Sequence, residues 1–163
     1  MSEEALNARA IFDLLAAHEV EYLLLGGFAV GAHGYIRATN DVDVMPAPDP
    51  ENLERLAAAI AELEGRVRGM EEFSESELPR PDAEGLLLGG NWVMETKHGR
   101  FDVMQLVSDL DYADLAASAV ESEVFGHRLR FCGYEHLVAM KEAAGRDEDL
   151  LDLKRLREAR GET

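Results

Sequence analysis

The strongest constraint on the fold of this chain is the segment LLLGGFAVGAHGYIRATNDVDV, which covers residues 23–44. Its first part, within EYLLLGG, is an apolar run that predicts a buried strand ending at Gly26-Gly27. FAVGAHG predicts a short helix closed by Gly34. NDVDVMP alternates aspartate with valine, which is typical of a strand with one buried face, and we expect this strand to stop before Pro46.

Two helices are predicted to flank this segment. Apolar residues near helical spacing predict the first helix over residues 4–18. The second is predicted over 50–63, with Asp49 as its N-cap, Pro50 at its first position and leucines and an isoleucine in a buried stripe. The order helix, strand, helix, strand, helix therefore opens the chain.

The second half of the chain continues with strands and ends with helices. Residues 71–85 are rich in acids and prolines, which indicates an exposed loop that is either a solvated connector or a lid. NWVMETKHGRFDVMQL and SEVFGHRLRFCG each predict two strands around a tight turn. Helices are expected at about 133–144 and 147–159, on either side of Gly145. We therefore predict an α+β fold with α/β character: one domain, 1–163, with a mixed sheet flanked by helices in 1–132 and a C-terminal helix pair in 133–163.

Composition excludes several classes of protein. No apolar run approaches the roughly 18–20 residues that a membrane span needs, and the N-terminus has no signal-peptide pattern, so we expect a cytoplasmic protein without a membrane partner. The single cysteine, Cys132, can form no internal disulfide and is interpreted as a small buried hydrophobe. The chain has 16 Lys and Arg against 33 Asp and Glu, and its formal net charge of −17 disfavours long-range attraction to nucleic acid or anionic lipid. A local basic groove would have to use a few residues, chiefly Arg37, Lys97, Arg100, Arg128, Arg130, Lys141 and Arg146.

The alternating strand presents two carboxylates on one side. Residues i and i+2 of a strand face the same way, so Asp41 and Asp43 lie about 7 Å apart at their Cβ atoms. Two ionised carboxylates at this spacing repel each other, and a hard divalent cation such as Mg²⁺ or Mn²⁺ relieves the repulsion. Asp102, in the alternating segment RFDVMQL, could supply a third ligand from a neighbouring strand. The pair alone is also compatible with an exposed strand face that binds nothing.

Other residues in the chain are suited to binding phosphate. Gly26 and Gly27 lie between a predicted strand and helix, where bare backbone N–H groups can approach a phosphate closely, although such a turn also occurs for structural reasons alone. Lys141 and Arg146, in or beside the C-terminal helices, could neutralise a polyphosphate that is bound between the glycines and a metal ion. Together these residues favour a site for a polyphosphate and a divalent cation.

Three motifs carry a family resemblance. GGFA, then RATNDVDV and later FDVM resemble the signature of the DNA polymerase β-type nucleotidyltransferase superfamily. The short version of this signature, followed by the segment MKEAAGRDEDLLDL, is most similar to the minimal bacterial AbiEii/MenT-like group. The motifs lie in 25–44, 101–106 and 137–153, and the order of elements fits the whole chain.

The resemblance implies an NTP substrate, an acceptor hydroxyl and release of pyrophosphate. Asp41, Asp43 and Asp102 would bind two Mg²⁺ (or Mn²⁺) ions, with Asp102 acting near the acceptor as metal ligand or base. Gly26 and Gly27 would hold the phosphates, Arg37 and Thr39 would support the loop or contact phosphate, and Lys141 would grip the triphosphate. Asp149 and Asp152 would orient the helix pair or Lys141; the alternative for Asp149 is an exposed helix acid.

The chain departs from the family pattern at two points. Many members have Gly-Ser where this chain has Gly27-Phe28, so only backbone donors remain at that position. Relatives that modify tRNA as toxins would be expected to carry a basic surface, which a net charge of −17 does not indicate. The acceptor therefore stays open among tRNA, a protein hydroxyl and a small molecule, and a toxin role with an antitoxin partner stays open as well.

Other chemistries fit the sequence less well. The five histidines have no His-Glu-x-x-His spacing, and the chain has neither a Gly-x-Ser-x-Gly elbow nor the Gly-Lys-Ser/Thr ending of a P-loop. The alternative from another class is a non-catalytic nucleotide-sensing or partner-binding module that keeps the same fold. Three candidate carboxylates favour the enzyme, since a binding module has little need for them.

Overall fold

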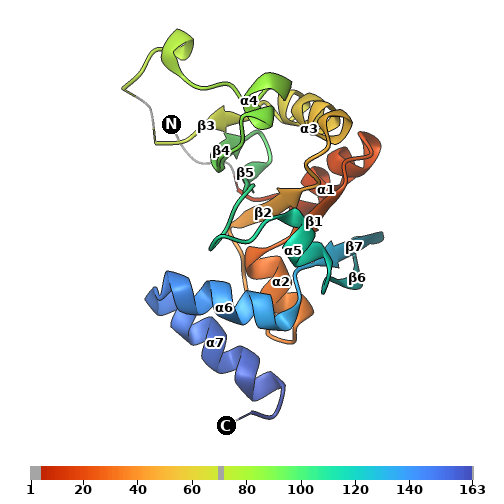
Figure 1. Cartoon of the computed structure of the whole chain (residues 1–163), viewed down its shortest axis with the longest axis vertical. Coiled ribbons are helices and arrows are strands. Elements are labelled where there is room, and N and C mark those ends of the chain that lie inside the picture. The colour runs from red at the N-terminus through yellow and green to blue at the C-terminus, as the bar shows by residue number, and fades with distance from the viewer. Residues whose placement is uncertain (1–4, 70–71, 163) are drawn as a thin grey trace.

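A computed structural model of the chain describes residues 5–69 and 72–162. Its elements are α1 (Ala8–Ala17), β1 (Tyr22–Leu24), α2 (Gly26–Ala32), β2 (Asp41–Pro46), α3 (Pro50–Glu62), β3 (Arg66–Val67), the 3₁₀ helix η1 (Glu75–Glu77), α4 (Ala83–Leu87), β4 (Trp92–Thr96), β5 (Gly99–Val103), α5 (Tyr112–Ala116), β6 (Val120–Val124), β7 (His127–Phe131), α6 (Tyr134–Ala144) and α7 (Asp147–Ala159). The protein is α+β, as predicted (Figure 1).

The strands form one mixed sheet of seven strands in the order β3-β4-β5-β2-β1-β7-β6. β1 pairs in parallel with β7, and β2 pairs in parallel with β5, whereas the other neighbours are antiparallel. The parallel register of β2 and β5 sets Asp43 directly beside Asp102. The two strands that carry the predicted carboxylates are therefore neighbours at the centre of the sheet.

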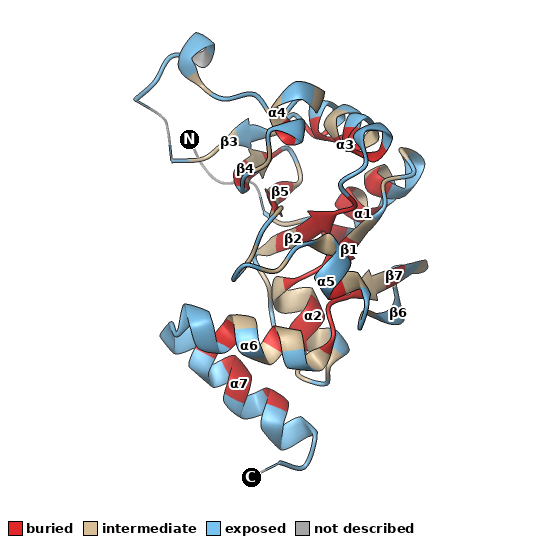
Figure 2. Cartoon of the chain, in the orientation of Figure 1, coloured by how far each residue is buried: buried red, intermediate tan, exposed pale blue. Residues whose placement is uncertain are grey.

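The core is formed by the sheet and the helices that pack on it. In Figure 1, α3 and α4 lie near β3 and β4, whereas α6 and α7 lie at the opposite end of the view, next to α2. α1 contacts α2, since the rings of Phe12 and Phe28 pack edge to face with their centroids 5.2 Å apart. Val42 and Val44, which alternate with the aspartates on β2, are fully buried, as are Phe12 and Phe101. Figure 2 shows the buried residues concentrated in the sheet and the inner helix faces, whereas α6 and α7 are mostly exposed apart from the sides that face each other or the sheet.

Helix ends agree with the capping residues of the sequence. Asp49 accepts a hydrogen bond from the backbone N–H of Asn52 at 3.1 Å, so α3 begins at Pro50 as predicted. Gly145 adopts a left-handed conformation with φ of 61° and ends α6.

The N-terminal helix begins only at Ala8, because Asn7 caps it by accepting a hydrogen bond from Ala10, so the prediction was wrong for the described residues 5–7. Position 4 lies outside the described residues.

Several local predictions need correction. β2 includes Pro46, because the backbone N–H of Ala47, the next residue, bonds to Glu21 and the pairing with β5 ends at Val44. α2 begins at Gly26 and not after the glycine pair. Of the predicted loop 71–85, position 71 lies outside the described residues; the described part is exposed over much of its length but contains η1 and the start of α4, which Asp82 caps.

Cys132 is fully buried, and burial raises the pKa of its thiol to about 12, so its interpretation as a buried hydrophobe is confirmed. Across residues 5–69 and 72–162, none of the helices has the length and apolar character that crossing a membrane requires.

Candidate active site

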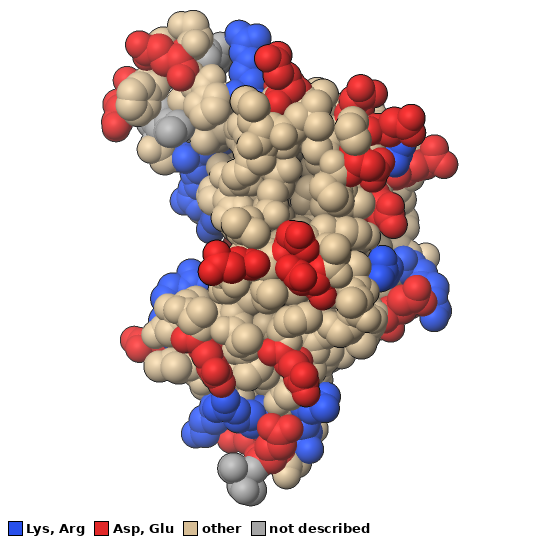
Figure 3. Space-filling model, viewed as in Figure 1, with Lys and Arg blue, Asp and Glu red and all other residues tan. Residues whose placement is uncertain are grey.

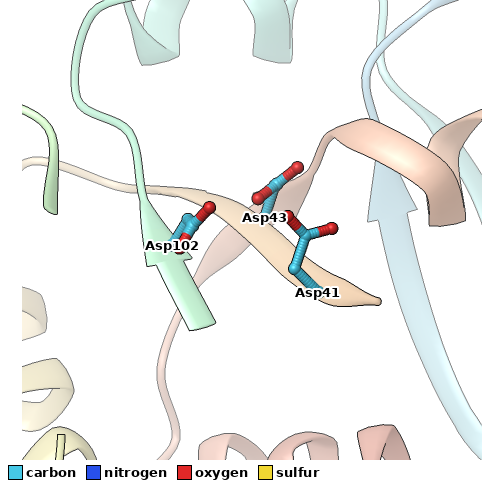
Figure 4. A group of neighbouring side chains, drawn as sticks. All are labelled: Asp41, Asp43 and Asp102. Carbon is cyan, nitrogen blue, oxygen red and sulfur yellow. The ribbon is translucent and has the colours of Figure 1, made fainter. Parts of the chain in front are cut away.

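Three carboxylates converge at the centre of the sheet. Asp41 and Asp43 point to the same side of β2, and Asp102 joins them from β5. One oxygen atom from each of the three side chains lies within 4.8 Å of the other two. Figure 4 shows the three carboxylates gathered above two adjacent strands. The structure thus brings together the three residues that the sequence predicts as metal ligands.

The Asp43 carboxylate is in an unfavourable position when no cation is bound. Burial, together with the negative charges of Asp41 and Asp102, raises the pKa of Asp43 to about 8. Its Oδ1 atom is buried and has no hydrogen-bond partner. Burial also raises the pKa of Asp102, although the charge of Arg100 opposes this effect. An unsatisfied buried oxygen among three acids fits a site for a divalent cation with oxygen ligands.

Arg100 is the cation nearest to the three acids. It lies two residues before Asp102 on β5 and faces the same side of the sheet. Its Nη2 atom lies 2.9 Å from Oδ2 of Asp102 and 3.8 Å from Oδ2 of Asp41. The guanidinium therefore neutralises part of the charge of the acidic cluster.

The glycine pair makes room for the side chains of the site. Gly26 has a φ of 60°, and a Cβ atom at this position would collide with the carboxylate of Asp43. A Cβ atom at Gly27 would collide with the Thr39 side chain, whose hydroxyl donates a 3.2 Å hydrogen bond to the carbonyl of Asp41. Only glycine permits this close approach. The pair consequently has a structural role in addition to the phosphate-binding role predicted from the sequence.

The acids lie in a cleft of about 610 Å³. All the site residues named by the sequence line it: Gly26, Gly27, Arg37, Thr39, Asp41, Asp43, Asp102, Lys141 and Arg146. Ala38, Asn40, Val93, Arg100, Met104, Glu148, Leu151 and Asp152 complete the lining. Figure 3 shows the outline of the molecule hollowed between the part that carries β3 and β4 and the C-terminal helices.

The C-terminal helices supply an ordered set of cations. The ammonium of Lys141 lies 3.1 Å from Oδ1 of Asp149 and 2.9 Å from Oδ2 of Asp152. Arg37, from the loop between α2 and β2, donates two hydrogen bonds to Asp152. Arg146 is largely exposed and pairs with Asp149 at 2.7 Å. Two buried acids on α7 thus fix three cations at one wall of the cleft.

The alternative view of Asp149 as an exposed helix acid is wrong, because Asp149 is fully buried. Burial would raise the pKa of its carboxyl, but hydrogen bonds from Arg146 and Lys141 outweigh burial and lower it. The sequence signal for this burial is weak, since the spacing Asp149 to Asp152 is common on exposed helices. The cations that match Asp149 are Lys141 of α6 and Arg146, which lies directly before α7.

Not every cation considered for a basic groove reaches the cleft. Lys97 lies 3.8 Å from Glu64, and Arg128 pairs with Glu121 at 2.7 Å on the β6–β7 hairpin. Arg130 donates hydrogen bonds to Tyr112 and to the backbone of Ala116. On the face shown in Figure 3, acidic side chains are spread widely and Lys and Arg form small separate groups.

Comparison with known proteins finds structural but not sequence relatives. No family model matches the chain, and no curated protein matches it in sequence. The solved structure of the lincosamide antibiotic adenylyltransferase LnuA, bound to lincomycin, is similar with a TM-score of 0.60 and 14% identity, covering 94% of this chain and 98% of LnuA.

Two other solved structures share this architecture. ANT(2″)-Ia in complex with adenylyl-2″-tobramycin aligns with a TM-score of 0.58 and 16% identity over 90% of this chain and 83% of that chain. An antigenic nucleotidyltransferase-like protein from Paracoccidioides brasiliensis aligns with a TM-score of 0.50 and 13% identity over 91% of this chain and 72% of that chain. The mixed sheet and its flanking helices are therefore those of the nucleotidyltransferase fold.

Proposed function

We propose that this protein is a metal-dependent nucleotidyltransferase, which transfers an NMP from an NTP to an acceptor hydroxyl and releases pyrophosphate. The observation that carries the proposal is the convergence of Asp41, Asp43 and Asp102 in a cleft whose wall holds Arg37, Lys141 and Arg146. A nucleotidyltransferase fold is consistent with it, although at 13–16% identity the structural relatives indicate the fold alone.

The three carboxylates would hold Mg²⁺ or Mn²⁺, and the unsatisfied Asp43 oxygen is the feature that fits this role. When bound, two such ions would supply Lewis-acid activation of an attacking hydroxyl and charge stabilisation for the leaving pyrophosphate. The carboxylates themselves set the positions of the ligand oxygens. Asp102, whose pKa is raised by burial, would in addition accept the proton of the acceptor hydroxyl.

The remaining residues would bind and align the triphosphate. Gly26 and Gly27 let the phosphates approach the backbone N–H groups at the start of α2, where Leu25 provides no side-chain cap. Lys141, Arg146 and Arg37 would neutralise phosphate charge as the triphosphate enters. Thr39 would support the loop through its bond to Asp41. Positioning and electrostatic stabilisation of this kind supply much of the rate enhancement in phosphoryl chemistry.

The acceptor side of the cleft has a different character. Val93 of β4 and Met104, which follows β5, are apolar and line the part of the cleft formed by the sheet. Three of the four described cations in the cleft belong to the wall formed by the C-terminal helices and the loop before β2. This distribution, together with the net charge of −17, favours a small hydroxyl-bearing molecule over a polyanion. LnuA and ANT(2″)-Ia, which have bound lincomycin and adenylyl-2″-tobramycin respectively, offer parallels.

A role as a tRNA-modifying toxin with an antitoxin partner is the competing acceptor hypothesis, suggested by the AbiEii/MenT-like resemblance. Binding of the purified protein to total tRNA at low and at physiological salt separates the two hypotheses. We expect weak binding at both. Tight binding that falls steeply with salt, without a partner protein, would favour the toxin.

Mass spectrometry of products tests the function itself. The protein is incubated with Mg²⁺, each NTP in turn and a cell extract, and the small molecules and macromolecules are searched for the added mass of an NMP. We expect one adduct that is absent with the Asp43→Asn variant. Binding of an NTP without any adduct would favour a non-catalytic nucleotide-sensing module.

A further inference from the structure

Arg100 and Glu95 face each other across the ladder between β5 and β4. Directly opposite residues of an antiparallel pair lie on the same face, with Cβ atoms about 4.5–5.5 Å apart. Each of the two side chains has a buried polar atom without a hydrogen-bond partner: Nε of Arg100 and Oε1 of Glu95. A donor without a hydrogen bond and a carboxylate oxygen without a hydrogen bond therefore occupy neighbouring positions beside the acidic cluster, although that oxygen forms an ion pair with Arg68.

The guanidinium of Arg100 is turned toward the cluster. Its Nη2 atom donates a 2.9 Å hydrogen bond to Asp102 and lies 3.8 Å from Asp41. Glu95 forms an ion pair with Arg68, whose Nε atom lies 3.3 Å from Oε1. In this arrangement Arg100 provides the positive charge that a metal ion would otherwise provide. Its Nε–H donor, however, forms no hydrogen bond.

We propose that Arg100 has two positions: it neutralises Asp102 and Asp41 in the metal-free protein, and it moves to Glu95 when a divalent cation occupies the carboxylates. The inference rests on the metal site of the proposed function. A cation at the carboxylates repels the guanidinium and competes for the same oxygens. At Glu95 the departing guanidinium would find a carboxylate, and its Nε–H would donate to that carboxylate beside Arg68.

This arrangement has a consequence for metal affinity. Arg100 lets the acidic cluster exist without metal, because it offsets part of the repulsion among the carboxylates. Metal binding must then displace Arg100. In the absence of a nucleotide, the metal ion therefore binds more weakly than it would bind to the same three carboxylates without Arg100. Glu95 reduces that cost because it accepts the displaced guanidinium.

A double-mutant cycle on Mn²⁺ affinity tests the proposal without any nucleotide. Mn²⁺ is titrated into the wild type, Arg100→Gln, Glu95→Gln and the double variant, and bound metal is followed by calorimetry and by the electron paramagnetic resonance signal of free Mn²⁺. Asp43→Asn serves as the blank for unspecific binding to an acidic protein. Arg100→Gln should bind Mn²⁺ about tenfold more tightly, which is within the usual coupling between contacting residues.

Glu95→Gln should weaken Mn²⁺ binding several-fold in the wild type and should have almost no effect when Arg100 is already glutamine. A long-range charge effect of Glu95 would instead weaken binding equally in both backgrounds, and that result would overturn the proposal. Equal or weaker binding by Arg100→Gln would overturn it too. If the wild type binds no more Mn²⁺ than Asp43→Asn does, the metal site of the proposed function fails, and this inference fails with it.

Arg100→Lys provides the second variant if Arg100→Gln does not fold without metal. Lysine keeps a positive charge near Asp102, but its ammonium lacks the fork of guanidinium donors and pairs with Glu95 only as a point charge. We expect metal-free stability close to that of the wild type and a reduced effect of Glu95→Gln on Mn²⁺ affinity. Loss of metal-free stability in Arg100→Lys together with an undiminished effect of Glu95→Gln would contradict a specific bond from Nε of Arg100 to Glu95.

Discussion

Arg37 donates two hydrogen bonds to Asp152, 2.8 Å from Nε to Oδ1 and 2.9 Å from Nη2 to Oδ2. This pair joins the loop that precedes β2 to α7, which is distant in sequence. Asp152 also contacts Lys141, so one buried carboxylate positions two cations of the cleft wall. Burial would raise the pKa of Asp152, but the hydrogen bonds from Arg37 and Lys141 outweigh burial and lower it.

Replacing Asp152 with asparagine should destabilise the protein and weaken NTP binding together. The change removes one buried charge and leaves Arg37 and Lys141 without their shared partner, which typically costs about 3 kcal/mol. We expect urea unfolding to show a loss of this order. Glu158→Gln on the same helix is the matched control, because its pair with Arg155 is half exposed and worth under about 1 kcal/mol. Equal losses in the two variants would mean that Asp152 has no special role.

Lys141→Met should weaken NTP binding more than metal binding. The ammonium lines the cleft and is held by Asp149 and Asp152, so it is positioned to meet phosphate oxygens as a point charge. Affinities for an NTP analogue and for Mn²⁺ are measured at a temperature well below the melting temperature of the variant. We expect roughly a tenfold loss for the analogue. Unchanged NTP affinity would restrict Lys141 to holding α6 against α7.

The stability of the metal-free protein should depend on the protonation of Asp43. The pKa of this carboxyl is about 8 in the folded protein against an ordinary value of 3.8. Between these values the folded state holds a proton that the unfolded state has lost, so the free energy of unfolding falls as pH rises. The free energy of unfolding falls by at most about 1.4 kcal/mol per pH unit, and the decrease ends above the pKa of Asp43 in the folded protein.

Asp43→Asn removes this dependence and provides the measurement. Urea unfolding of both proteins in EDTA is compared at pH 5.5 and pH 8. The variant should gain on the wild type by on the order of 2 kcal/mol between the two pH values. Added Mg²⁺ should restore wild-type stability at the higher pH, because the cation binds the ionised carboxylate. A constant difference between the two proteins would show that Asp43 is already ionised at low pH.

Gly26→Ala should damage the site, whereas Gly31→Ala on the same helix should not. A methyl group at Gly26 meets the Asp43 carboxylate and requires an unfavourable positive φ, but nothing lies within 4 Å of a Cβ atom at Gly31. We expect a loss of about 2 kcal/mol or more and weaker Mn²⁺ binding for the first variant. Alanine in the interior of α2 should be neutral or stabilise by up to about 1 kcal/mol. Thermal melting with and without Mn²⁺ distinguishes them.

The central elements could be predicted because their physical signals are local. The alternation of Asp41 and Asp43 with two buried valines predicts a strand and its faces, and Asp49-Pro50 predicts where α3 begins. The short elements β3, α4 and α5 were missed, since two to five residues carry too little periodicity.

The contacts of the site depend on tertiary structure that local patterns do not encode. The parallel pairing of β2 with β5 sets Asp102 beside Asp43, and the sequence offered Asp102 only as a candidate for this place. The burial of Asp149 and Asp152 follows from cations that reach them from α6 and from the loop before β2. The sequence suggested Arg100 only as one of several candidates for a basic groove. Its position on the same face as the three acids is evident only from the register of the sheet.

Transfer of label from the α-phosphate is the most direct test of the proposed reaction. The protein is incubated with Mg²⁺, cell extract and either α-³²P- or γ-³²P-labelled NTP, with Asp43→Asn as the blank. We expect that only the α label enters an acceptor, that the γ label leaves as pyrophosphate, and that both events are lost in the variant. Transfer of the γ label, or α-label transfer that persists in Asp43→Asn, would contradict nucleotidyl transfer at these three carboxylates.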